Sequence, residues 1–165
     1  MTLGNRETAR GTFPLVPAGP AHWPSVETLL SSHRLPLEGA QEHSANFLVA
    51  LASGNVVGAI GLEVHGRVGL LRSLAVHRGS ANRGLGTELV AATVARAQTL
   101  GLRELYLLTT SAADFFARRG FERVDRSTLP AVLAGSRELQ GACPASATAM
   151  RLALSGGVRT LSTEG

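Results

Sequence analysis

A strand, a glycine-rich loop and a helix follow one another near the middle of the chain. The apolar run at residues 70–76 is followed by a loop at 77–87, and a helical pattern then continues to residue 100. The first amides of a helix have no partner inside it, and the helix dipole is positive there. Gly84 and Gly86 let a phosphate group approach the backbone closely, so the stretch predicts an anion site. Two arginines add positive charge at its rim, Arg78 and Arg83.

A simple βα turn that needs glycine for its geometry has the same local pattern, so a Gly-x-Gly pair alone does not distinguish an anion site from an ordinary turn.

The chain has 165 residues, enough for one domain with its own core. We expect that domain at residues 12–154, with flexible tails at 1–11 and 155–165. No run of 18 uncharged apolar residues is present and the N-terminus lacks an apolar stretch, so neither a membrane span nor a signal peptide is expected. The single cysteine, Cys143, excludes an internal disulfide and favours a reducing cytoplasm.

All 16 basic residues are arginine, and the formal net charge is +4. Without lysine, a lysine nucleophile or Schiff base is excluded. Arginine suits phosphate recognition because its planar fork binds two oxygens at once. A nucleic-acid partner would also fit a basic chain, but the arginines are scattered and aromatic residues make up only 4%. We therefore expect no nucleic-acid partner, and a nucleic-acid binder stays an alternative on the arginine count alone.

The hydrophobic pattern predicts a mixed α/β fold. Short turns around Gly54 and Gly66 join three apolar runs into an antiparallel meander. The strand–helix–strand order that follows predicts a right-handed parallel crossover. Strands are expected at 12–16, 47–51, 56–64, 68–76, 104–109, 121–124 and 147–154, and helices at 21–33, 37–43, 84–100 and 111–119.

Two motifs at this spacing resemble the GCN5-related N-acetyltransferase (GNAT) superfamily. Residues 81–86, Ala-Asn-Arg-Gly-Leu-Gly, follow the family's pattern Arg/Gln-x-x-Gly-x-Gly/Ala, with Ala81 in the first position and Arg83 as a substitute charge. Residues 112–121 resemble the family's aromatic helix before Gly-Phe, and the order of elements matches as well. The resemblance implies a mixed central sheet of about seven strands, whose fourth and fifth strands splay apart. It also implies acetyl-CoA as cosubstrate, and it implies no metal.

Three phrases resemble a narrower branch, the arsenic-resistance N-acetyltransferases. They lie at residues 71–76, 105–110 and 143–147. This resemblance implies a small primary-amine acceptor, such as an amino-acid-like organoarsenical or a phosphinothricin analogue. Nothing in the composition itself points to arsenic.

The superfamily resemblance also assigns cofactor residues. The backbone of Leu74, Ala75 and Val76 would bind the pantetheine arm, and the amide of Leu74 or Ala75 would polarise the thioester carbonyl. Thr109 stands where many members carry an Asn that bonds the arm. Phe116 stands where many carry a Tyr, which removes one proton donor for the leaving thiolate. The pyrophosphate would lie against Ala81, Asn82, Arg83, Gly84, Leu85, Gly86 and Thr87.

The acceptor side leaves alternatives open. Arg72 in an apolar strand needs an anion, which is either Glu63 or a substrate carboxylate. Glu63 is either the general base or a solvated strand end, and solvated ends are the more common case. Ser73 neighbours Arg72 on the strand, and we expect substrate contacts from it and from two residues of the last loop, Cys143 and Ser146. Three further side chains are expected to be structural, His65 and His77 at the surface and Tyr106 as a packed aromatic.

Two other functions stay open at this point. An acetyltransferase of a protein N-terminus would share the same cofactor loop. A non-catalytic acyl-CoA sensor would explain both Ala81 and Phe116. A homodimer is expected because the edge strands of such sheets are commonly paired.

Overall fold

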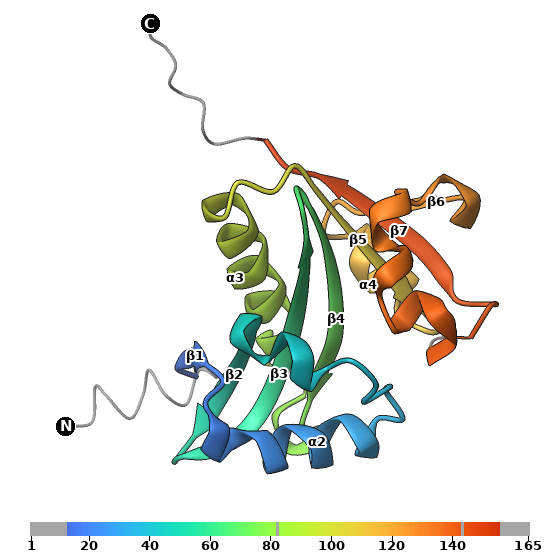
Figure 1. The fold of residues 1–165 in the computed structure, drawn as a ribbon. Helices are drawn as coiled ribbons and strands as arrows, with labels where there is room; N and C mark the ends of the chain where they lie inside the picture. The colour runs from blue at the N-terminus through green and yellow to red at the C-terminus, as the bar shows by residue number, and fades with distance from the viewer. Residues whose placement is uncertain (1–12, 82, 143, 156–165) are drawn as a thin grey trace, which may run out of the picture. The chain divides into compact units, whose positions relative to one another are not determined.

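A computed structural model describes residues 13–81, 83–142 and 144–155 of the chain (Figure 1). These residues divide into two compact units. Unit 1 takes the described residues up to Gly61 together with Ser73–Thr93. Unit 2 takes Leu62–Arg72 together with the residues from Val94 onward. Each unit is described by itself below.

Seven strands make up one sheet, as the sequence predicts. Their hydrogen-bonding order is β1-β2-β3-β4-β5-β7-β6. The β3 and β4 strands pass from one unit into the other. The strands are β1 Leu15–Pro17, β2 Phe47–Ala52, β3 Asn55–His65, β4 Val68–Val76, β5 Glu104–Thr109, β6 Glu122–Val124 and β7 Thr148–Ala153.

The core of unit 1 forms where helix α2, Trp23–Ser32, packs against the sheet. Four apolar residues of α2 were expected on one side, and all four are buried: Trp23, Val26, Leu29 and Leu30. The Trp23 ring meets Phe47 of β2 edge-on, with 5.1 Å between ring centroids. The predicted side of the helix is therefore confirmed as the one that the sheet covers.

Turn chemistry sets the register of the meander. Ser53 and Gly54 both have positive φ, +53° and +83°, which is the two-residue type I′ turn that joins β2 to β3. Gly66, at φ +66°, opens the equally short turn that joins β3 to β4. Glycine makes both turns possible without steric cost.

Helix α3, Leu85–Thr99, begins directly after the glycine-rich loop. In unit 1 its first turns lie close to β3, since a Cβ on Gly58 would come within 3.1 Å of Leu85 and Leu89. Gly101 follows the helix at φ +81°, as expected of a glycine that ends one. Among the described helices, none has the length and apolar character needed to cross a membrane.

In unit 2, β5 pairs with β4 in parallel and with β7 in the antiparallel sense. The β4–β5 ladder covers three residue pairs and ends at Leu70 and Tyr106. Both strands continue beyond it, β4 to Val76 and β5 to Thr109.

Several predicted boundaries are wrong. The helix expected at 37–43 is a 3-10 turn at Gln41–Asn46, because Gly39 at φ +77° breaks the chain before it. The helix expected at 111–119 covers only Ala113–Ala117, and this is α4. The first strand begins at Leu15. Short helical turns lie between β6 and β7 at Arg126–Thr128, Ala131–Gly135 and Glu138–Ala142.

Candidate functional site

Ser73 has a left-handed backbone inside strand β4. Its φ is +61°, and its side chain is buried. Two other non-glycine residues of the described chain have positive φ, Arg34 and Ser53, and both lie in turns. A non-glycine residue in this conformation costs on the order of 1–3 kcal/mol, and such strain collects at functional sites. The strand is thus distorted at one point, immediately before Leu74.

The three residues after Ser73 are the ones expected to bind the pantetheine arm. Ala75 is buried, while Leu74 and Val76 are half-buried. Side chains on a strand alternate between faces, so Leu74 and Val76 share one face and Ala75 takes the other. A residue with positive φ inside a strand is typical of a β-bulge, and bulges are common next to active sites.

The glycine-rich loop begins with a capped turn. The His77 side chain accepts a hydrogen bond at Nδ1 from the Gly79 amide at 3.0 Å, and this exposed histidine lies at the surface as predicted. The guanidinium-bearing residues Arg78 and Arg83 are both exposed, as is Ala81. Asn82 lies outside the described residues.

Gly84 has the geometry that an anion-binding loop needs. Its φ is +78°, and a Cβ built on it would meet no atom within 4 Å. The Gly84 carbonyl accepts from the Glu88 amide at 3.0 Å, so the helix ladder starts here. The Leu85 side chain is buried, and any part that this residue has in binding comes from its backbone. Gly86 is half-buried and Thr87 is exposed.

In unit 2, Glu63 and Arg72 form a buried ion pair. Nη1 of Arg72 donates to Oε2 of Glu63 at 2.7 Å, and both side chains are 0% exposed. Glu63 is therefore not a solvated strand end, and that expectation is wrong. Of the two anions considered for Arg72, the internal carboxylate is the one present.

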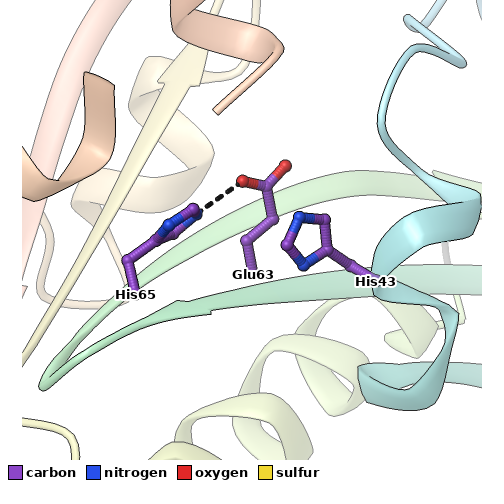
Figure 2. A group of neighbouring side chains, drawn as sticks. All are labelled: His43, Glu63 and His65. Atoms are coloured by element: carbon purple, nitrogen blue, oxygen red, sulfur yellow. Dashed lines mark hydrogen bonds and ion pairs between the residues drawn. The ribbon is translucent and has the colours of Figure 1, made fainter. Parts of the chain in front are cut away.

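His65 belongs to the same group. Its Nε2 lies 2.8 Å from Oε1 of Glu63, and its side chain is 15% exposed (Figure 2). An ionised carboxylate only accepts hydrogen bonds, so Nε2 carries the hydrogen in this pair. His65 was expected as a surface residue, but it is tied to a buried carboxylate instead.

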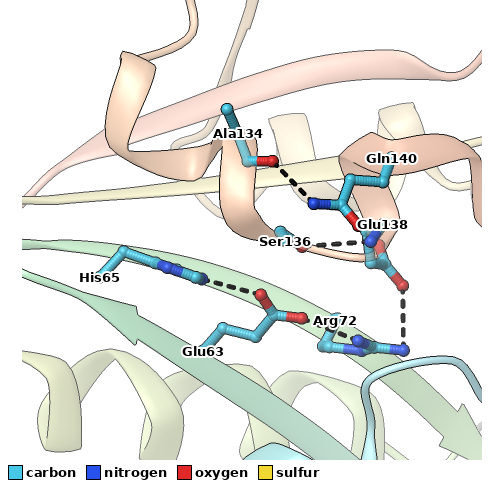
Figure 3. Close-up of polar contacts among 7 residues, drawn as sticks. All are labelled: Glu63, His65, Arg72, Ala134, Ser136, Glu138 and Gln140. Atoms are coloured by element: carbon cyan, nitrogen blue, oxygen red, sulfur yellow. Dashed lines mark hydrogen bonds and ion pairs between the residues drawn. The ribbon is translucent and has the colours of Figure 1, made fainter.

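Glu138 is the residue of this group that sequence reasoning missed. It lies between β6 and β7, with its side chain 4% exposed and Oε2 3.4 Å from Nη2 of Arg72 (Figure 3). The Glu138 amide donates to Oγ of Ser136 at 3.1 Å. Nothing in the local sequence marks Glu138, because it lies 66 positions after Arg72 in the chain.

Thr109 and Phe116 have structural contacts of their own. Oγ1 of Thr109 accepts from the Ala112 amide at 2.9 Å, just before α4. Phe116 is buried and packs edge-on against Phe115 and Phe121. Its ring belongs to an aromatic cluster and offers no proton, so a contact with the cofactor stays a prediction for both residues.

The remaining expected residues are placed as follows. Ser146 lies in an exposed turn before β7, and Cys143 lies outside the described residues. Tyr106 is buried, as expected of a packed aromatic, and its hydroxyl donates to Oε1 of Glu104 at 3.2 Å. Burial raises the pKa of Tyr106, and the nearby charge of Glu104 adds to this effect.

Comparison with protein families gives one match. The model described as "Acetyltransferase (GNAT) family" matches residues 16–121 of the chain. This range begins within β1, ends after α4, and includes Ser73, the glycine-rich loop and Arg72.

Two relatives illustrate the sequence similarity. An amino-acid acetyltransferase of Neisseria meningitidis is 28% identical over 95 residues, which are 56% of this chain and 22% of the relative. An uncharacterized N-acetyltransferase of Chlorobaculum tepidum is 30% identical over 95 residues, which are 57% of this chain and 61% of the relative. The chain thus spans about a fifth of the first relative.

Two solved structures share the fold. N-acetylglutamate synthase from Neisseria gonorrhoeae, in complex with coenzyme A and N-acetyl-glutamate, has a TM-score of 0.76 at 22% identity. The match covers 87% of this chain and 35% of that one. Rv2747 from Mycobacterium tuberculosis, in a complex with CoA, has a TM-score of 0.73 at 23% identity, over 86% of this chain and 99% of the other.

Proposed function

This chain belongs to the acetyltransferase (GNAT) family, and on that premise we propose that it is an acetyl-CoA-dependent N-acetyltransferase. Its acceptor is the primary amine of a small, amino-acid-like molecule. The observation that carries the proposal is the left-handed Ser73 in β4, which directly precedes the segment expected to hold the thioester. The open loop at Gly84 supports it independently.

The residues of unit 1 fit acetyl-CoA. A phosphate needs backbone amides that it can reach without steric hindrance, and Gly84 leaves the space around its Cα open. Positive charge is supplied by the start of α3 and by the exposed Arg83. Arg83 would replace the polar side chain that the family motif has at its first position, where this chain has Ala81. When bound, acetyl-CoA supplies its acetyl group as a thioester.

The chain itself would supply orientation and charge stabilisation. In this proposal the amide of Leu74 or Ala75 donates to the carbonyl oxygen, where negative charge develops as the amine attacks. Holding the two reactants in one geometry accounts for much of the rate in such transfers. The ammonium first loses one proton to water. The amine nitrogen then forms the C–N bond as the C–S bond breaks, its second proton passes to water, and the leaving coenzyme A thiolate takes up a proton from water.

Glu63 was a candidate general base, but its contacts favour a positioning role. Its two oxygens already face His65 and Arg72. A carboxylate engaged on both oxygens is better suited to fixing its neighbours than to taking a proton from an incoming amine. We therefore assign proton removal to water and a positioning part to Glu63.

Two comparisons support an amino-acid-like acceptor. Proteins named amino-acid acetyltransferases are among those that match this chain, and N-acetyl-glutamate is bound in one structural neighbour. An organoarsenical or phosphinothricin acceptor, which carries an amino-acid amine, is a narrower form of the same proposal. We also propose that the protein works in a reducing cytoplasm and forms a homodimer.

Thermal stability with and without acetyl-CoA tests the first half of the proposal. A ligand that binds only the folded state raises its stability by RT ln(1 + [L]/Kd), about 2.7 kcal/mol at roughly 100-fold excess over Kd. Thiol release from the same samples, across glutamate, other amino acids, phosphinothricin and an N-terminal peptide, tests the second half. Release with amino acids supports the proposal, and release only with the peptide favours the N-terminal alternative. A stability shift without release would favour the acyl-CoA sensor.

A further inference from the structure

A pocket of about 170 Å³ lies in unit 1, between the start of helix α2 and the 3-10 turn at Gln41–Asn46. Its lining residues come from two short segments, 18–23 and 41–45. Pro20, Gln41 and Ala45 are exposed, so a molecule can enter the pocket from solvent. A cavity of about 150 Å³ is large enough to hold a benzene ring. The size of this pocket therefore suits a molecule with a single ring.

The side of the pocket formed by residues 18–23 is mainly apolar. Ala18, Pro20 and Trp23 line it. The Trp23 indole is only 7% exposed, and its Nε1 donates to Oε2 of Glu27 at 3.1 Å. The polar atom of the indole therefore has a partner within the protein, and the rest of the ring is an apolar surface. A planar ring packs favourably against such a surface.

The side formed by residues 41–45 carries hydrogen-bonding groups. Gln41 and Ser44 line it, together with Ala45. The amide of a glutamine and the hydroxyl of a serine can each both donate and accept hydrogen bonds. Among the described residues that line the pocket, none is ionisable. An apolar side that faces a few neutral polar groups is typical of a small-molecule site.

Hydrogen bonds hold both sides of the pocket in place. The Ala18 amide donates to the Phe47 carbonyl at 2.9 Å, and the Phe47 amide donates to the Ser44 carbonyl. The Gly19 amide donates to Nδ1 of His22 at 2.9 Å. Both segments are thus tied to Phe47 at the start of β2. A ligand does not have to order them when it binds, which lowers the cost of binding.

We propose that this pocket binds a small neutral molecule with one planar ring and a carboxamide or lactam group. The ring lies against Trp23, and the amide-like group exchanges hydrogen bonds with Gln41 and Ser44, which offer the complementary donor and acceptor. An anion of the same shape is disfavoured, because it loses its hydration beside the Glu27 carboxylate and gains no cation from the described lining residues. This site goes beyond the proposed function and does not depend on it.

Benzamide is the probe for this site, and benzoate, which has a carboxylate in place of the carboxamide, is the matched ligand control. Trp23 is the single tryptophan of the chain, so the one indole N–H resonance and the indole fluorescence both report on the pocket. We expect benzamide to shift this resonance with a Kd of about 1 mM, as few atoms are available for binding. Benzoate should bind at least about tenfold more weakly.

The first variant, Ala45→Leu, places a larger side chain in the pocket. Ala91→Leu, at an exposed alanine of α3, is its matched control. The second variant, Gln41→Glu, keeps the shape of the side chain but replaces the amide donor by a charged oxygen. All three positions are exposed, and such substitutions leave the fold intact.

We expect Ala45→Leu and Gln41→Glu to weaken benzamide binding by about tenfold or more, while Ala91→Leu leaves it within about twofold. An indole resonance that does not move at about 20 mM benzamide would overturn the inference. Benzoate that binds as tightly as benzamide would show that the pocket does not select a neutral amide. Undiminished binding to Ala45→Leu would show that benzamide lies elsewhere. Each of these results is independent of whether the protein acetylates an amine.

Discussion

Arg72 donates to Glu63 at 2.7 Å between neighbouring strands β3 and β4, and both side chains are completely buried. This pair decides between two roles that the sequence left open for Arg72. A guanidinium that already faces Glu63 and Glu138 is occupied by internal carboxylates. We therefore do not propose that Arg72 selects an acidic acceptor.

Removal of one partner of this pair should destabilise the protein strongly. Arg72→Met leaves the buried carboxylates of Glu63 and Glu138 without the guanidinium that they share, and the expected loss in the free energy of unfolding is about 3–5 kcal/mol. Chemical denaturation measures it. The triple variant Glu63→Leu, Arg72→Met and Glu138→Leu should recover much of that loss, because it removes all three charges together. A triple variant no more stable than Arg72→Met would contradict this.

Gly84→Ala should weaken acetyl-CoA binding more than it weakens the fold. An alanine at φ +78° is strained by about 1 kcal/mol, although the space around Gly84 is open. Gly101→Ala is the matched control, because Gly101 has φ +81° and equally open surroundings after α3. Both variants should lose similar stability, and only Gly84→Ala should lose acetyl-CoA affinity by titration calorimetry. Equal acetyl-CoA affinities in the two variants would contradict the prediction that the glycine-rich loop binds the cofactor.

Gly61→Ala should disturb the core of unit 1. A Cβ at Gly61 would lie 2.3 Å from the ring of Phe47, so the buried ring must move. Overpacking of this kind costs about 1–3 kcal/mol. Trp23 is the single tryptophan and touches Phe47, so its fluorescence reports the change directly. Gly135→Ala, where a Cβ meets nothing within 4 Å, should be close to neutral. Adding Phe47→Leu to Gly61→Ala should restore part of the loss.

The single tyrosine offers a direct pH measurement. Burial raises the pKa of Tyr106 above its ordinary value of 10.0, and Glu104 raises it further. The folded state therefore holds the phenol proton more tightly than the unfolded state. The stability that this contributes is fully present below pH 10.0 and is lost as the pH rises through the folded-state pKa. Near-ultraviolet absorbance of the phenolate should show a late transition, and Glu104→Gln should move it to lower pH. A transition at the ordinary value in the native protein would contradict this.

The fold could be predicted well because its signals are local. The strand at 68–76 and the strand at 104–109 are found where expected, since apolar runs with glycine turns at their ends specify them. The side of α2 that is buried also follows from the spacing of Trp23, Val26 and Leu30. The short helix at 37–43 was wrong because a single glycine conformation, at Gly39, decides that region.

The candidate site could be predicted only where it depends on backbone conformation. A glycine such as Gly84 indicates a positive φ in the sequence itself, since glycine alone adopts a positive φ readily. Ser73 gives no such signal, because nothing in a serine predicts φ +61°. The Glu63–Arg72–Glu138 cluster depends on a contact between segments far apart in the chain. The sequence showed that Arg72 needs an anion, but not that two glutamates supply it.

The measurement that tests the central claim most directly is the mass of an amino acid incubated with acetyl-CoA and the purified protein. The account predicts that the wild-type protein adds one acetyl group to the amine of at least one amino-acid-like acceptor, with one thiol released for each product formed. It also predicts that Gly84→Ala slows this reaction at limiting acetyl-CoA while Gly101→Ala does not. Thermal stabilisation by acetyl-CoA without acetylation of any amine would contradict the account and leave an acyl-CoA binding protein in its place.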